Sequence, residues 1–207
     1  MADADLKDLS DAHTQMPSLK GRKAIITGGT TGIGRAIGVL LASEGVEIFT
    51  CGRDAQHLRD GLARINEVGK GDGINVDLAE KEGLNRFFAE AANRLGSYDI
   101  AIINAAVSLE GGSSLYAGIK KGIQGFAEAL RKEVSSKGIK VGLVEPGLTG
   151  SDLQYPGIPA EKQREMINAE KMLRAEDIAV AVHFMLTQPR RAVVQQLAVT
   201  QRVSEEA

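Results

Sequence analysis

Short apolar runs alternate with longer amphipathic segments over most of the chain, from residue 21 onward. The apolar runs predict strands over 23–27, 46–51, 73–76, 98–104 and 140–144, with a last apolar run over 193–199. Helical spacing predicts helices over 33–44, 55–67, 80–95, 115–135 and 175–186. Apolar strands that alternate with helices are typical of a parallel sheet covered on both faces. We therefore expect one α/β domain over 21–207 with a doubly wound parallel sheet, preceded by an N-terminal extension over 1–20.

Composition excludes several classes of protein. The chain has 207 residues, and its 25 basic and 27 acidic residues give a net charge of −2, which offers no basic field for nucleic acid or an anionic membrane. A single cysteine, Cys51, excludes an intrachain disulfide and fits a reducing compartment. The three histidines are dispersed, so no metal site is expected. The longest apolar stretches are too short to span a bilayer, and the start is polar and acidic, unlike a signal peptide. We expect a cytoplasmic protein.

A glycine-rich turn, Thr-Gly-Gly-Thr-Thr-Gly-Ile-Gly over 27–34, joins the first predicted strand to the first helix. Glycines at these positions permit a tight turn, a close approach to a phosphate and close packing of the helix on the sheet. A turn without a ligand is the alternative, but the strand before it and the helix after it favour dinucleotide binding at the helix N-terminus. The expected cofactor contacts here are Gly28, Thr30, Thr31, Gly32, Ile33 and Gly34.

The end of the second predicted strand bears on the choice of cofactor. NAD-binding folds usually place an acid there, whereas this chain has Gly52 followed by Arg53. A guanidinium at this position pairs well with a 2′-phosphate, which favours NADP over NAD. The alternatives are that Arg53 is a solvated surface residue and that Asp54 caps the next helix.

Two further strand ends are expected at the same carboxyl edge of the sheet, where such folds bind their ligands. Asp77, followed by Leu78, has two compatible roles: it can accept a hydrogen bond from the adenine amino group, and it can cap the next helix. Asn104 and Ala105 end the fourth strand and are expected beside the cofactor.

Tyr116 and Lys120 lie four residues apart on a predicted helix and therefore share one face. A lysine ammonium near a phenol stabilises the phenolate and lowers its pKa from about 10. Tyr116 is thus a candidate general acid toward a carbonyl oxygen. Alone, a tyrosine and a lysine at this spacing are weak evidence for a catalytic pair. After a dinucleotide-binding motif in the same chain, the evidence is strong.

In the order and context of these motifs the chain resembles the short-chain dehydrogenase/reductase family, with its Rossmann-like fold, over about 21–199. The resemblance implies that Tyr116 exchanges the proton with the substrate oxygen and that Lys120 binds the nicotinamide ribose and tunes Tyr116. It also implies that Pro146 and Gly147 border the nicotinamide, with Ser151 near the cofactor. Family members are commonly homodimers or homotetramers that act on small-molecule alcohols or carbonyls, so we expect the same here.

The chain departs from the family between Asn104 and Tyr116, where about forty residues, a helix and a strand, are absent. The family's catalytic serine precedes the tyrosine by thirteen positions, which here is Ile103, and its relay asparagine has no counterpart. Ser108, Ser113 and Ser114 are substitutes without the family spacing.

Two explanations follow from this interval. Either a stretch of a longer chain is omitted, or the sheet has truly lost a central strand. The first is favoured, because a lost strand leaves buried backbone groups unpaired.

We therefore expect an NADP-dependent oxidoreductase that interconverts a secondary alcohol and a ketone or similar carbonyl. The alternative is a catalytically impaired NADP-binding protein acting as a sensor or scaffold.

Overall fold

The computed structural model describes residues 16–106, 114–154 and 157–203, and of Leu115, Tyr116 and Leu153 the backbone alone. Helices and strands alternate along the chain, with short 3-10 turns at Ser135–Lys137 and Asp152–Gln154. In order they are β1 (Lys23–Thr27), α2 (Gly32–Ser43), β2 (Glu47–Gly52), α3 (Ala55–Asn66), β3 (Lys70–Asn75), α4 (Lys81–Leu95), β4 (Ile100–Ile103), α5 (Ser114–Val134), β5 (Leu143–Pro146), α6 (Ala160–Asn168), α7 (Ala175–Leu186) and β6 (Gln196–Val199).

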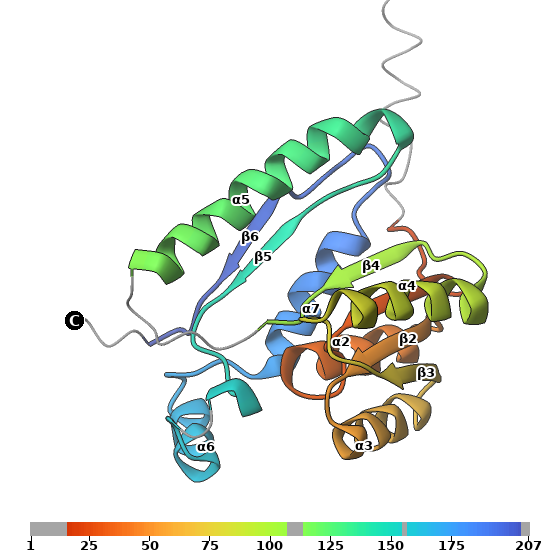
Figure 1. The fold of residues 1–207 in the computed structure, drawn as a ribbon. Coiled ribbons are helices and arrows are strands. Elements are labelled where there is room, and N and C mark those ends of the chain that lie inside the picture. Colours follow the sequence, from red (N-terminus) through yellow and green to blue (C-terminus); the bar gives the residue numbers. More distant parts are fainter. Residues whose placement is uncertain (1–15, 107–113, 155–156, 204–207) are drawn as a thin grey trace, which may run out of the picture.

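Four of the strands form a parallel sheet in the order β3-β2-β1-β4 (Figure 1). Ile25 in β1 is in register with Phe49 on one side and with Ala101 on the other. The remaining two strands, β5 and β6, pair in parallel as a separate sheet. The order reverses direction beside β1, where a doubly wound sheet opens its ligand crevice.

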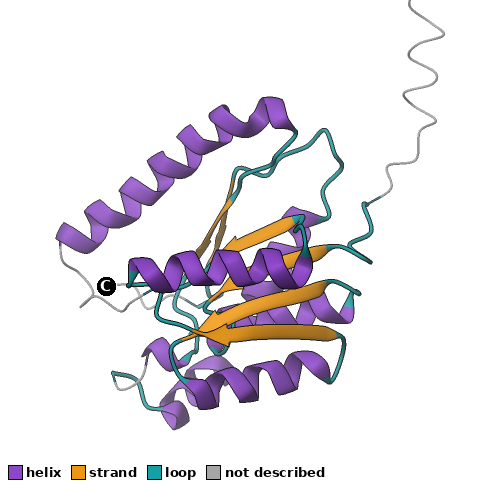
Figure 2. Cartoon of the chain, turned by 45° about the vertical axis from the view of Figure 1, so that its right-hand side comes forward, coloured by secondary structure: helices purple, strands orange, loops and turns teal. Residues whose placement is uncertain are grey.

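Both faces of the four-stranded sheet are covered by helices, as Figure 2 shows. On one face Ile26 and Ile48 are fully buried with Ile37 and Leu41 of α2 and Val182 of α7. On the other face the aromatic rings of Phe49 and Phe87 stack with centroids 5.7 Å apart, so α4 packs on β2. The apolar side chains of β1 and β2 thus have a core on each face of the sheet, as the sequence pattern predicts.

The helices and strands other than α6 agree with the prediction, with differences of a few residues at their ends. The strand predicted from residue 73 begins at Lys70, because β3 pairs with β2 along Lys70–Asn75 although this stretch contains polar residues and glycines. The strand predicted over 140–144 lies at Leu143–Pro146, where it pairs with β6. Leu19, within the predicted N-terminal extension, is buried in the main core.

Strand β4 is the edge of the four-stranded sheet, because its one strand partner among the described residues is β1. Its sequence, Ile-Ala-Ile-Ile, is apolar on both faces, as in an interior strand. Yet Ile103 is 72% exposed and Ala101 is also exposed. In both views α5 lies along the β5–β6 sheet and not over β4 (Figures 1 and 2).

Candidate functional site

The turn between β1 and α2 has the geometry of a phosphate-binding loop. Gly28 and Gly32 have φ values of +67° and +50°, a region in which side chains other than glycine are strained. A Cβ atom on Gly34 would overlap the carbonyl oxygen of Gly28 and lie 2.6 Å from Nδ2 of Asn104. The backbone of the turn therefore folds back tightly against the start of α2, which requires glycine at these positions.

Thr50, at the centre of β2, stabilises this turn through hydrogen bonds of its side chain. Its fully buried hydroxyl donates to the carbonyl oxygen of Ile26 at 2.7 Å and accepts the Gly29 N–H at 3.0 Å. A Cβ atom on Gly29 would overlap that hydroxyl oxygen. Thr50 did not emerge from the sequence as a site residue, although a hydroxyl inside an otherwise apolar strand was a signal.

Asn104 and Ala105 hold the turn from the side of β4. The Asn104 side-chain amide donates to the carbonyl oxygens of Thr27 and Gly28 at 3.2 and 3.1 Å. In return the Thr27 hydroxyl accepts the backbone N–H groups of Asn104 and Ala105 at 2.9 and 3.0 Å. The structure thus brings these two residues to the glycine turn, at the carboxyl edge of the sheet.

The first turn of α2 suits an anion. Thr31 is the N-cap residue, but its side chain makes no capping hydrogen bond, so the first amides of the helix remain available to a ligand. The first turn also carries no acidic residue that would oppose a phosphate. The diphosphate of a dinucleotide fits these features.

The packing of Thr30 explains why residue 52 is a glycine. Thr30 is 7% exposed, and a Cβ atom on Gly52 would lie 2.5 Å from its Cγ2 and 2.7 Å from its Oγ1. The Thr30 side chain therefore packs against the end of β2. No acid fits at residue 52 unless Thr30 moves.

Arg53 follows directly and is exposed, with no hydrogen bond or ion pair to any residue that the structure describes. The neighbouring acid, Asp54, is the N-cap of α3 and accepts the His57 N–H at 2.7 Å. This hydrogen bond lowers the pKa of the Asp54 carboxyl. The interpretation of Asp54 as a helix cap is therefore confirmed.

At the end of β3, Asp77 is exposed and accepts the Ala79 N–H at 2.9 Å. The helix after it begins at Lys81 with Glu80 as its N-cap. The predicted role of Asp77 as that cap is therefore wrong: its carboxylate closes a turn three residues earlier. Leu78 packs against the core on the α4 face.

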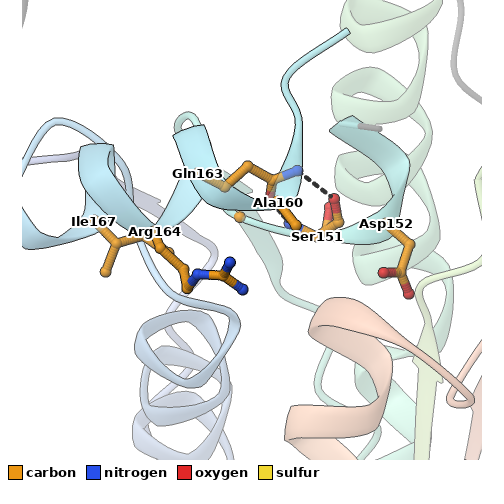
Figure 3. Close-up of a pocket in the computed structure, with 7 residues that line it drawn as sticks. Ser151, Asp152, Ala160, Gln163, Arg164 and Ile167 are labelled. Atoms are coloured by element: carbon orange, nitrogen blue, oxygen red, sulfur yellow. Dashed lines mark hydrogen bonds between the residues drawn. The ribbon is translucent and has the colours of Figure 1, made fainter. Parts of the chain in front are cut away.

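After β5 the chain returns to the glycine turn. The Gly147 N–H donates to the carbonyl oxygen of Val199 at 2.7 Å, which anchors the segment after Pro146 to β6. A Cβ atom on Gly32 would lie 3.1 Å from the Cβ of Ser151, so Ser151 packs directly against the start of α2. Ser151 also lines a cavity of about 290 Å³ between this segment and α6 (Figure 3).

The predicted catalytic pair lies on α5. The Tyr116 side chain falls outside the described residues, as do Ser108 and Ser113, whereas Ser114 is the first residue of the helix. Lys120 is exposed one turn after Tyr116. Gln124, one turn further, hydrogen-bonds to Glu145 of β5 and thereby lowers the pKa of that carboxyl.

The comparisons with known proteins agree with this fold. Residues 22–114 match the family model described as short chain dehydrogenase. The 3-oxoacyl-(acyl-carrier-protein) reductase FabG of Haemophilus influenzae is 25% identical, over 81% of this chain and 91% of its own length. A short chain dehydrogenase from Burkholderia cenocepacia, solved in complex with NADP, is 22% identical, with a TM-score of 0.74 over 89% of this chain and 98% of that one. A short chain dehydrogenase from Mycobacterium paratuberculosis, bound to NAD, is 19% identical and also has a TM-score of 0.74, over 88% and 97%.

Over residues 22–114 the chain therefore matches the short chain dehydrogenase family, and its fold is that of the solved short chain dehydrogenases. The relatives that it resembles are reductases, which supports an oxidoreductase acting on CH–OH or C=O groups. The alignment with the Haemophilus reductase spans 222 positions but takes up 81% of this 207-residue chain, about 168 residues. About 54 positions of that alignment therefore have no residue in this chain. In the part of the chain that the structure describes, no helix combines the length and apolarity needed to cross a membrane.

Proposed function

We propose that this protein is an NADP-dependent oxidoreductase that interconverts a secondary alcohol and a ketone or similar carbonyl. The glycine turn carries the proposal, because Thr50, Thr27 and Asn104 hold its backbone fixed in front of an α2 N-terminus without an acidic residue. Gly28, Thr30, Thr31, Gly32, Ile33 and Gly34 would form the backbone cradle for the diphosphate. Asp77, Leu78, Asn104 and Ala105 would contact the adenosine and the nicotinamide ribose along the same sheet edge.

The preference for NADP over NAD follows from the end of β2. An acid that would grip the 2′-hydroxyl is excluded at Gly52 by Thr30, and the next side chain is the unengaged guanidinium of Arg53. A charge-assisted bond from Arg53 to a 2′-phosphate favours the phosphorylated cofactor. Titrating the protein with NADPH and with NADH by calorimetry tests this preference, and equal affinities would contradict it.

Tyr116 and Lys120 would carry the proton chemistry. When bound, the cofactor would provide the chemistry of hydride exchange with the carbonyl carbon. During reduction Tyr116 gives its phenolic proton to the carbonyl oxygen, and the Lys120 ammonium stabilises the phenolate that remains. Pro146, Gly147 and Ser151 would border the nicotinamide half, where Ser151 packs against Gly32.

Tyr116→Phe tests this assignment. We expect loss of turnover with NADPH binding retained, because the change removes one hydroxyl and leaves the glycine turn intact. The assay follows NADPH absorbance with a panel of ketones and aldehydes. Undiminished turnover of the variant would remove Tyr116 from the mechanism.

A second candidate, an NADP-binding protein without turnover, is favoured by one observation. Strand β4 ends as an exposed edge, and α5, which carries Tyr116 and Lys120, lies along β5 and β6.

The intact mass of the protein purified from its source separates the two candidates. A mass well above 22.0 kDa would indicate an additional segment and favour the reductase. A mass of 22.0 kDa, together with tight NADPH binding and no oxidation across the carbonyl panel, would favour the binding protein.

We also propose a cytoplasmic homodimer or homotetramer. Ile119, Ile123 and Phe126 follow helical spacing on α5, and their side chains are 44%, 45% and 66% exposed. Apolar side chains that share one helix face and reach solvent together are typical of an interface. Light scattering after size exclusion tests the assembly, with Phe126→Glu as the variant expected to shift it toward monomer.

A further inference from the structure

Gln163 of α6 is one of the few buried polar side chains in the described part of the chain, at 8% exposed. Its amide oxygen accepts the Ser151 N–H at 2.9 Å. Its amide nitrogen donates to the carbonyl oxygen of Ser151 at 3.3 Å (Figure 3) and to that of Ile158 at 2.8 Å. One side chain therefore holds three backbone groups, which lie on both sides of the short turn at 152–154.

The segment held by Gln163 is fixed on its other side by Leu173. The Leu173 N–H donates to the carbonyl oxygen of Leu148, and its own carbonyl oxygen accepts the Gly150 N–H, both at 2.8 Å. Space is tight here, since a Cβ atom on Gly150 would lie 3.0 Å from the side chain of Ile167. Residues 148–151 are thus clamped between Gln163 and Leu173.

This clamp determines where Ser151 meets the glycine turn. Ser151 packs against Gly32, the first residue of α2, whose N-terminal amides would face the diphosphate in the proposed function. Gln163 itself lies on α6 and lines the same cavity as Ser151. A change at Gln163 can therefore reach the turn through Ser151.

We propose that Gln163 is a positioning residue that fixes Ser151 at the dinucleotide site and so couples α6 to cofactor binding. The proposal rests on the proposed function in one respect, that the turn binds NADPH. A glutamine is required because the site needs an acceptor and two donors on one uncharged group. Glutamate would place a carboxylate against two carbonyl oxygens, and methionine would supply neither donors nor an oxygen acceptor.

The test is a double-mutant cycle on NADPH affinity with Gln163→Met and Ser151→Ala, measured by calorimetry. If Gln163 acts through Ser151, each single variant weakens binding by about threefold to tenfold, the loss of roughly one hydrogen bond, and the double variant is no weaker than Ser151→Ala. Effects that multiply in the double variant, or unchanged affinity in Gln163→Met, would overturn the proposal. Lys162→Gln, at an exposed position on the same helix, is the matched control.

Hydrogen exchange of the cofactor-free protein gives an independent readout. We expect Gln163→Met to accelerate exchange of the Ser151, Gln154 and Ile158 amides, with β1 and β2 unchanged. Unchanged exchange would show that Gln163 does not fix the backbone at Ser151, and the proposal would be overturned. If the wild-type protein binds no NADPH but Gln163→Met accelerates this exchange, then the proposed function fails and the clamp on Ser151 stands.

Discussion

Replacing Thr50 with valine isolates the single hydroxyl that joins β2 to the glycine turn. Valine has nearly the same shape, so the change leaves the packing of the fully buried side chain in place. It leaves the buried Gly29 N–H without its acceptor and removes the hydrogen bond to the Ile26 carbonyl oxygen. Thr50→Ser is the control, because serine keeps the hydroxyl and loses one methyl group.

The expected magnitude follows from the two lost interactions. A buried donor without a partner costs about 1–3 kcal/mol, and a lost hydrogen bond costs about 1 kcal/mol, so Thr50→Val should reduce the free energy of unfolding by roughly 2–4 kcal/mol. For a chain of this size that corresponds to a decrease of roughly 5–15 °C in Tm. Thr50→Ser should cost about 1 kcal/mol, the loss of one buried methyl group.

Urea unfolding followed by far-ultraviolet circular dichroism measures both free energies, and calorimetry measures NADPH affinity in the same samples. We expect Thr50→Val to weaken NADPH binding more than Thr50→Ser, because the hydroxyl holds the Gly29 amide in the turn. The reasoning is refuted if the two variants have unfolding free energies within about 0.5 kcal/mol of each other, the accuracy of such comparisons.

Three other changes test separate parts of the structure. Gly34→Ala should abolish NADPH binding and lower the free energy of unfolding by about 1–3 kcal/mol, because its Cβ overlaps the Gly28 carbonyl oxygen; calorimetry and urea unfolding measure these effects. Arg53→Ala should weaken NADPH binding roughly tenfold or more and leave NADH binding unchanged, as calorimetry with both cofactors would show. The Lys23 N–H, with a neighbouring guanidinium, lowers the pKa of Asp99. The charged carboxylate therefore stabilises the fold above the ordinary carboxyl pKa, and this contribution is lost as pH falls through the lowered value. Asp99→Asn should thus reduce the acid dependence of unfolding free energy between about pH 5 and 2, and an unchanged dependence would contradict this role.

The pattern of apolar positions determined the order and type of the helices and strands by itself, because the 2- and 3.6-residue periods of strands and helices are local properties. The glycines themselves located the turn, since Gly28 and Gly32 can adopt positive φ without the strain that a side chain would add. Helix ends were predictable where a cap residue marked them, as Asp54 does for α3.

Tertiary structure alone decided how the strands group and which polar side chains support the site. Backbone pairing, which does not depend on side-chain type, extends β3 back to Lys70 and places β4 at a sheet edge beside β1. The partners that fix the turn and the loop after β5 come from distant positions: Thr50 binds Gly29 across 21 residues and Gln163 binds Ser151 across 12. Such hydrogen bonds form only when separate elements pack together, because no local period places a hydroxyl or an amide against a backbone group so far along the chain.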